Sequence, residues 1–297
     1  MINRILVPLL LTLSAASTLQ ARIIHEERSL YRNIVVEDSR LLRCLKFTRV
    51  RANPLNQSCI IRAEPRRLVF DYSKLVMGSV LLKPQPENIL VIGLGGGTII
   101  KAFQELFPDA MITAVEIDPA VVAVAREYFD YQDGDGIRTV VADGRVFVKR
   151  AGLQGEKYDY ILLDAFNGDY IPEHLMTREF LEEVQALLDD DGLLVANTFS
   201  SSSLYDHESV TYASVFGDYY NLKFPDTVSN RVIFASRTPL PAPASLADQV
   251  EYWAERLEPY DVPLRKVFRS IQSEPDWDPS ARVLTDQYAP ANLLRGN

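Results

Sequence analysis

The stretch that decides the fold is Ile89-Leu90-Val91-Ile92-Gly93-Leu94-Gly95-Gly96-Gly97-Thr98, an apolar run that leads directly into a glycine-rich loop. The apolar run predicts a buried strand over Ile89–Ile92, and the spacing after the loop predicts a helix over Thr98–Phe107. Without side chains, the loop backbone can come close to a ligand. Taken alone the loop is a weak signal, because nicotinamide enzymes also have glycine-rich first turns, with the fingerprint G-x-G-x-x-G.

Apolar runs and helical spacing then alternate along the chain. Strands are predicted over Met111–Val115, Thr139–Val141, Tyr158–Leu163 and Leu193–Asn197, and helices from Pro119 to about Phe129, through Val146 and Val148, and over Thr177–Leu188. Pro119 suits the first turn of its helix, where a missing N–H costs nothing. The alternation predicts an α/β protein with a doubly wound parallel sheet and helices on both faces.

Other patterns flank this α/β core. Residues 28–62 alternate apolar and polar side chains, which predicts short antiparallel strands, and residues 66–82 have helical spacing. Further elements are expected after the core, namely an antiparallel pair at Leu222–Phe224 and Arg231–Ala235, a helix at Leu246–Leu257, and a tail that wraps the surface. We therefore expect a small β-sheet domain plus helix at 22–86, a Rossmann-like domain at 87–240, and a C-terminal helix and tail at 241–297.

The first 21 residues differ from the rest. Arg4 precedes an apolar run from Ile5 to Ala16, and small residues follow, a pattern typical of a secretory signal peptide or an anchor. The run is short for a spanning helix and is interrupted by Pro8, and a buried helix or strand is the alternative. A signal would place the chain in the periplasm or at a membrane through residues 1–21, whereas a nucleotide-type cofactor is normally made and kept in the cytosol.

Cys44 and Cys59 are the only cysteines. An even number in an exported chain permits one disulfide, and a hairpin would bring the two residues face to face. Two ordinary buried thiols are the alternative.

The composition limits the possible functions. The chain has 297 residues, 47% of them hydrophobic, and a net charge of 31 − 40 = −9. This charge argues against a nucleic-acid partner, which requires a basic surface, and suits a cationic small molecule. The three histidines, His25, His174 and His207, have no metal-ligand spacing, so we expect no metal site.

Carboxylates follow the predicted strands. Glu116 ends the second strand and can accept hydrogen bonds from both ribose hydroxyls. Asp143 ends the third, where it can bind an adenine amino group, cap the following helix, or do both. Asp164 ends the fourth at the expected ligand crevice, and Asp169 follows in the same loop, where a turn role is the alternative. In this order, the loop and carboxylates predict a transferase that uses S-adenosylmethionine or its decarboxylated form.

The stretch from Tyr31 to Ala235 resembles the spermidine synthase (polyamine aminopropyltransferase) family, most closely its divergent spermidine-synthase-like bacterial members. The residues that carry the resemblance are Ser29-Leu30-Tyr31, Asn56-Gln57-Ser58, Phe70-Asp71-Tyr72, Ile89–Thr98, Val115–Asp118, Ala142-Asp143-Gly144, Leu163-Asp164-Ala165-Phe166 and Ile171-Pro172. The resemblance implies a small N-terminal β-sheet domain beside a methyltransferase-like Rossmann domain, commonly in a homodimer. It also implies transfer of an aminopropyl group from decarboxylated S-adenosylmethionine to an amine such as putrescine.

The resemblance further assigns roles to residues. It implies a cofactor site formed by Gly93, Gly95, Gly97, Glu116, Asp118, Asp143, Gly144 and Pro172, and an amine site formed by Gln57, Tyr72, Asp164 and Asp169. Asp164 matches the catalytic aspartate, which orients the amine and accepts its proton.

The chain also departs from the family pattern. The glycine loop has no aspartate, Tyr-His-Glu is replaced by Tyr72-Ser73-Lys74, the usual glutamine by Arg32, and the second aspartate of D-x-x-D by Asn167. Two alternatives therefore remain. One is a methyltransferase that uses intact S-adenosylmethionine, whose carboxylate Lys74 would suit. The other is a binding protein that has kept the fold without turnover.

Overall fold

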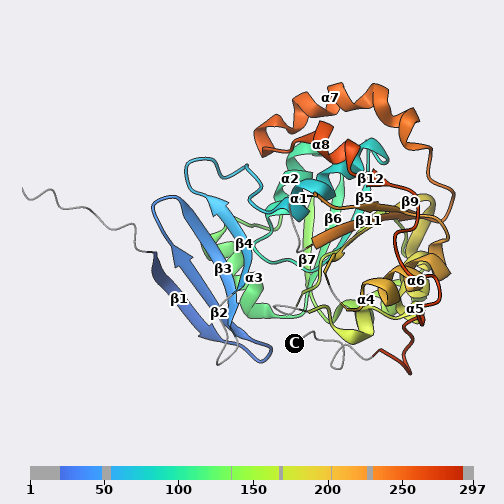
Figure 1. Cartoon of the computed structure of the whole chain (residues 1–297). Coiled ribbons are helices and arrows are strands. Elements are labelled where there is room, and N and C mark those ends of the chain that lie inside the picture. The colour runs from blue at the N-terminus through green and yellow to red at the C-terminus, as the bar shows by residue number, and fades with distance from the viewer. Residues whose placement is uncertain are drawn as a thin grey trace, which may run out of the picture.

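The computed structural model of the chain describes residues 21–48, 55–134, 136–166, 170–201, 203–225 and 230–289 (Figure 1). They form a four-stranded sheet and an eight-stranded sheet. The signal or anchor segment predicted at 1–21 lies outside the described residues, apart from Ala21, and stays a prediction. Within the described part, no helix is both long and apolar enough to cross a membrane.

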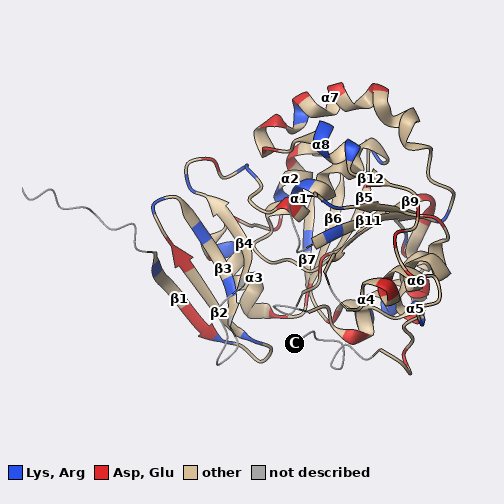
Figure 2. Ribbon diagram, in the orientation of Figure 1, with Lys and Arg blue, Asp and Glu red and all other residues tan. Residues whose placement is uncertain are grey.

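The N-terminal sheet is an antiparallel meander, as the alternating pattern predicted. Its strands are β1 (Arg22–Arg28), β2 (Asn33–Asp38), β3 (Leu42–Thr48) and β4 (Leu55–Ile61), in the order β1-β2-β3-β4. One face packs its apolar residues on helix α3 (Pro119–Tyr128), and Figure 1 shows this sheet beside α3. Acidic and basic residues lie close together on the sheet (Figure 2), and they include a cross-strand pair between Glu37 and Lys46 at 2.5 Å.

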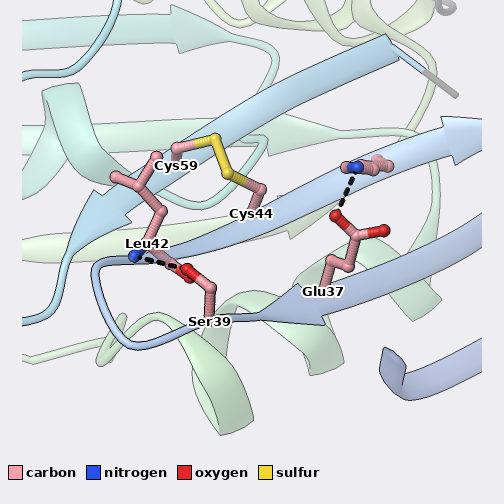
Figure 3. Close-up of a disulfide and its surroundings, with 6 residues drawn as sticks. Glu37, Ser39, Leu42, Cys44 and Cys59 are labelled. Atoms are coloured by element: carbon pink, nitrogen blue, oxygen red, sulfur yellow. Dashed lines mark hydrogen bonds and ion pairs between the residues drawn. A yellow bond between two sulfur atoms is a disulfide. The ribbon is translucent and has the colours of Figure 1, made fainter. Parts of the chain in front are cut away.

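A disulfide joins Cys44 of β3 to Cys59 of β4 (Figure 3). The two cysteines are direct partners in the antiparallel register, with Cα atoms 4.1 Å apart. The β2–β3 turn beside them is closed by Ser39, whose Oγ accepts a hydrogen bond from the Leu42 amide at 2.9 Å. Of the two alternatives left by the sequence, the structure has the disulfide.

The large sheet has the strand order β12-β10-β11-β9-β8-β5-β6-β7. Its parallel part consists of β5 (Asn88–Ile92), β6 (Met111–Glu116), β7 (Ile137–Val141), β8 (Tyr158–Leu163) and β9 (Leu188–Phe199). The strand order reverses on either side of β5, since β6 and β8 flank it. Loops after β5 and β8 therefore open into one crevice, where ligands of doubly wound sheets bind. The doubly wound α/β fold is confirmed.

Two layers of helices cover this sheet, because side chains alternate between the two faces of each strand. One layer contains α1 (Asp71–Met77), α2 (Thr98–Leu106), α3 (Pro119–Tyr128), α7 (Ala247–Leu257) and α8 (Leu264–Arg269). The other contains α4 (Gly144–Leu153), α5 (Arg178–Leu187) and α6 (Tyr205–Phe216) (Figure 1). β10 (Tyr220–Leu222) and β11 (Asn230–Ser236) form the expected antiparallel pair. Short 3-10 turns occupy Gly78–Leu81, Glu173–Leu175, Pro243–Leu246 and Glu258–Tyr260.

Three element predictions need correction. The helix predicted over 66–82 is α1 followed by a 3-10 turn, because the chain tightens from Gly78 onward. The helix predicted to reach residue 188 ends at Leu187, and β9 begins at Leu188, five residues before the predicted strand. The tail contains α8 and a short strand, β12 (Ile271–Gln272), which pairs with β10. Elements this short have too few apolar repeats to be found by periodicity.

The disulfide should stabilise the chain by restricting its unfolded state. It closes a loop of sequence separation 15, for which the expected contribution is about 3 kcal/mol. We therefore expect reduction with a thiol to lower the free energy of unfolding by about that amount in urea titrations followed by circular dichroism. The Cys44→Ala/Cys59→Ala variant, with and without reductant, is the control for side effects of the thiol. A loss below about 0.5 kcal/mol on reduction would contradict the prediction.

Candidate active site

A cavity of about 740 Å³ lies at the carboxyl ends of the parallel strands. This volume suits a nucleoside-sized ligand together with a small second substrate. Nine residues predicted for the site line the cavity: Gln57, Tyr72, Gly93, Gly95, Glu116, Asp143, Gly144, Asp164 and Pro172. Gly97 and Asp118 do not line it, and Asp169 lies outside the described residues.

The loop after β5 approaches β8 very closely. Gly93 has φ +104°, and a Cβ atom placed on it would lie 2.3 Å from the carbonyl oxygen of Asp164. The amide of Asp164 donates to the carbonyl of Ile92 at 2.8 Å. Only glycine permits this approach, which places the loop after β5 against the backbone of Asp164.

Glu116 lies at the end of β6 with 6% of its surface exposed. Its carboxylate accepts backbone hydrogen bonds from Leu94 at 3.2 Å and from Asp118 at 3.0 Å. Burial raises the pKa of Glu116, although the nearby Arg32 charge and the two amides act in the opposite direction. A carboxylate offers about four acceptor sites, so this fixed group retains capacity for two ligand hydroxyls.

Asp118 and Gly97 have structural roles and do not line the cavity, and their expected cofactor contacts stay predictions. Asp118 is 1% exposed and caps α3 by accepting from the Ala120 amide at 3.0 Å. Its second oxygen accepts from the Ser29 hydroxyl at 2.5 Å, which ties the β1–β2 loop to the large sheet. Gly97 has φ +70° at the start of α2, where a Cβ atom would meet the Tyr131 ring at 2.5 Å.

Asp143 has the capping role and also lines the cavity. One oxygen accepts from the Val146 amide at 3.0 Å, and the other lies 2.9 Å from Nε2 of His174. Burial raises the pKa of Asp143, but these hydrogen bonds outweigh it and hold the pKa below the ordinary value. The ionised group can accept one more hydrogen bond from a ligand amino group.

Asp164 follows β8 directly and lines the cavity. Its Oδ1 accepts from Nδ2 of Asn197 at 2.8 Å, and its Oδ2 lies 3.4 Å from the Tyr72 hydroxyl. Burial raises the pKa of Asp164 to about 7, even though both hydrogen bonds favour the ionised form. A carboxyl group that titrates near neutral pH can accept a proton from a bound ammonium group.

Several residues that line the cavity were not predicted as site residues. They are Asn197 and Asn230, the aromatic residues Tyr31, Phe47, Phe70, Phe166 and Phe199, and His174. Asn197 ends the strand after Asp164, so the rule that identified the carboxylates could have identified it. Tyr31, Phe70 and Phe166 lie in stretches that carry the family resemblance, so that signal could have found them. Asn230, Phe47 and Phe199 gave no comparable signal, because they join the cavity only in the folded chain.

Lys74 does not serve the cavity, which corrects the expectation that it could meet a ligand carboxylate. Its Nζ lies 2.8 Å from Oδ2 of Asp261, on the far side of α1 from the cavity lining. Arg67 binds the same carboxylate at 3.1 Å. Among the described residues, no three histidine, cysteine, aspartate or glutamate side chains gather to hold a metal ion.

The methyltransferase-like sheet, the glycine loop and the strand-end carboxylates define a nucleoside-binding transferase of the Rossmann type. The sequence model of the spermine/spermidine synthase domain matches residues 69–230, more than half of the chain. The chain belongs to the spermine/spermidine synthase family.

Two relatives show how far the similarity extends. The chain is 49% identical to a polyamine aminopropyltransferase of Vibrio vulnificus over 284 residues, which cover 95% of each chain. It is 39% identical to a polyamine aminopropyltransferase of Chromobacterium violaceum over 150 residues, which cover 50% of this chain and 56% of that protein.

Solved structures confirm the fold. A probable spermidine synthase from Corynebacterium glutamicum has a TM-score of 0.65 at 21% identity, with 88% of this chain and 99% of that chain covered. Human methyltransferase-like protein 13, solved with SAH, has a TM-score of 0.54 at 25% identity, with 76% and 100% covered.

The contact between Gly93 and Asp164 can be tested against a matched glycine. Gly95 also has a positive φ (+55°), but the nearest atom to its added Cβ is Ser58 Cβ at 3.7 Å. Gly95→Ala should therefore lower the free energy of unfolding by about 1–2 kcal/mol, the strain of an alanine in the left-handed region. Gly93→Ala adds a backbone overlap and should cost about 1–3 kcal/mol more in urea unfolding. Equal losses of unfolding free energy in the two variants would contradict the close approach of Gly93 to the Asp164 backbone.

Proposed function

We propose that this chain is a polyamine aminopropyltransferase that transfers an aminopropyl group from decarboxylated S-adenosylmethionine to an amine such as putrescine. The observation that carries the proposal is Asp164, a carboxyl group that lines the cavity and whose pKa burial raises to about 7. The relative from Vibrio vulnificus, at 49% identity over 95% of both chains, supports the same activity.

The cavity residues suit the two parts of the nucleoside. Glu116 would accept from the ribose hydroxyls, and Asp143 from the adenine amino group, since each carboxylate is held by backbone amides. Gly93, Gly95, Gly144 and Pro172 would shape the walls against the ligand.

The chemistry requires one proton acceptor. The amine is an ammonium ion at neutral pH and cannot attack until it loses a proton. Asp164 takes that proton, and the free amine nitrogen forms a bond to the aminopropyl methylene carbon that is attached to the sulfonium sulfur. The carbon–sulfur bond breaks, its electron pair goes to sulfur, and neutral methylthioadenosine leaves. Alignment of the two substrates in one cavity supplies much of the rate.

The remaining cavity surface suits an aliphatic amine. The Tyr72 hydroxyl lies 3.4 Å from Asp164, and Gln57 also lines the cavity. Asp169, predicted as a second carboxylate for the amine, lies outside the described residues. The rings of Phe70, Phe166 and Phe199 offer apolar contact to methylene groups and π-faces to an ammonium group.

Methyl transfer from intact S-adenosylmethionine loses its main support, because Lys74 is paired with Asp261. A non-catalytic binding role gives no reason for a buried carboxyl group at the crevice. The homodimer, the signal peptide and membrane association through residues 1–21 stay predictions. The disulfide fits an oxidising compartment, which is where a signal peptide would deliver the chain.

The proposal is tested by incubating the purified full chain with decarboxylated S-adenosylmethionine and putrescine and quantifying spermidine and methylthioadenosine by mass spectrometry. Asp164→Asn should lower kcat at least about 100-fold, roughly the contribution of a general base. Cofactor binding should change little, because Asn keeps the shape of the side chain. Asp190→Asn, at a side chain that is 99% exposed, is the matched control. A loss below about threefold for Asp164→Asn would exclude the assigned role.

The pH dependence should report the same carboxyl group. Burial raises the pKa of Asp164 to about 7, so the base form is lost as pH falls through that value. We expect kcat/KM for the amine to decrease below about pH 7 in the wild type. Because bound cations favour the ionised carboxylate, the limb in kcat should lie at lower pH than the limb in kcat/KM. Rate profiles that stay flat from pH 5 to pH 8, a range of about three units around the titration, would contradict this assignment.

A further inference from the structure

Asn197 and Asn230 form an amide pair beside Asp164. Nδ2 of Asn230 donates to Oδ1 of Asn197 at 3.0 Å, and Nδ2 of Asn197 donates to Oδ1 of Asp164 at 2.8 Å. Asn197 is 4% exposed, and both asparagines line the cavity. The three side chains thus form one directional series of hydrogen bonds that ends on the carboxylate.

The directions of the two bonds are coupled. An asparagine amide has one end that only accepts and one that only donates. When Asn230 donates to Oδ1 of Asn197, Nδ2 of Asn197 must face Asp164. If Asn197 turned over, its oxygen would face a carboxylate oxygen, an arrangement favourable only when Asp164 is protonated.

A buried cluster holds the two strands from the opposite side. Each asparagine is followed by a member of this cluster, Thr198 in β9 and Arg231 in β11, and successive strand residues point to opposite faces. Arg231 is fully buried and donates to Thr198 Oγ1 at 2.8 Å and to Ser209 Oγ at 2.7 Å. Glu208 of α6 lies 3.6 Å away and balances its charge.

We propose that Asn230 is a positioning residue for the transfer. By donating to Oδ1 of Asn197, it holds the Asn197 amide with Nδ2 toward Asp164, and this hydrogen bond keeps Asp164 in the carboxylate form that can accept a proton. This inference rests on the proposed role of Asp164 as proton acceptor. Neither Asn230 nor Arg231 contacts Asp164, so Asn230 acts through Asn197, and the Arg231 cluster keeps the two strand ends in register.

Other titratable or charged groups face the same cavity or lie behind it. They are Tyr31 and Arg32 of the β1–β2 loop, Tyr72 of α1, Glu116 at the end of β6, Asp143 after β7, Tyr170 of the loop after β8, Glu173 and His174 of the 3-10 turn, and, behind β9, Glu208 with Arg231. Among the described residues, hydrogen bonds to the Asp164 carboxylate come from Tyr72 and Asn197 alone. Loss of the Asn197 donor should therefore raise the pKa of Asp164.

The test compares three substitutions at one position in the full chain. Asn230→Leu removes the donor without adding charge, Asn230→Asp replaces it with an acceptor, and Asn230→Ser keeps a hydroxyl donor. For the first two, we expect the acidic limb of kcat/KM to move up by about one pH unit, with about a tenfold loss at pH 6.5 that is recovered at pH 9. In the serine variant, the acidic limb of kcat/KM should stay closer to its wild-type position, because the hydroxyl can still donate to Asn197. Thermal unfolding and cofactor affinity serve as controls for global damage.

A second measurement keeps the inference separate from the proposed activity. The Asp164 carboxyl is titrated by carbon-13 NMR in protein labelled only at aspartate, with its signal assigned from Asp164→Asn. Aspartate labelling avoids Glu208, the other buried carboxyl whose pKa burial raises to about 7. A higher Asp164 pKa in Asn230→Leu supports the inference even if the wild type does not transfer aminopropyl groups. Unchanged titration and an unchanged rate profile in a folded variant would overturn it, whatever the activity of the wild type.

Discussion

The site depends on one steric constraint, the absence of a side chain at Gly93. Parallel pairing of β5 with β8 places Ile92 opposite Leu163, so the loops after the two strands leave the sheet together. A Cβ at Gly93 would lie 2.3 Å from the backbone of Asp164. The loop that we propose receives the cofactor and Asp164, the proposed proton acceptor, are therefore neighbours because of one glycine.

The second constraint is the burial of Asp164. A rise in its pKa from 3.8 to about 7 corresponds to about 4 kcal/mol in favour of the neutral acid. The hydrogen bonds from Asn197 and Tyr72 favour the ionised form and are already included in this net shift, so the effect of burial exceeds their combined effect. The balance leaves a base whose pKa is near neutral pH, as proton transfer from an ammonium ion requires.

The sequence predicted those parts of the structure that depend on local pattern. Apolar runs located the parallel strands, and the acidic residues at or just past the strand ends, Glu116, Asp143 and Asp164, line the cavity. Asp118, which the resemblance assigned to the cofactor site, caps α3 as Asp143 caps α4, but it is 1% exposed and does not line the cavity. Lys74 was misjudged for a related reason: helical spacing does not tell which partner, here Asp261, lies on each side of α1. The Asn197–Asn230 pair joins two strands that are far apart in the chain, and only the antiparallel register of β9 and β11 brings them together.

The central claim is that this cavity receives decarboxylated S-adenosylmethionine as donor. The most direct test is calorimetric titration of the purified chain with the decarboxylated and the intact cofactor, side by side under the same conditions. We predict tighter binding of the decarboxylated form, because the cavity lining contains Glu116, Asp143 and Asp164, while Lys74, the expected partner of a carboxylate, binds Asp261 instead. Tighter binding of the intact form would contradict the account and would favour methyl transfer.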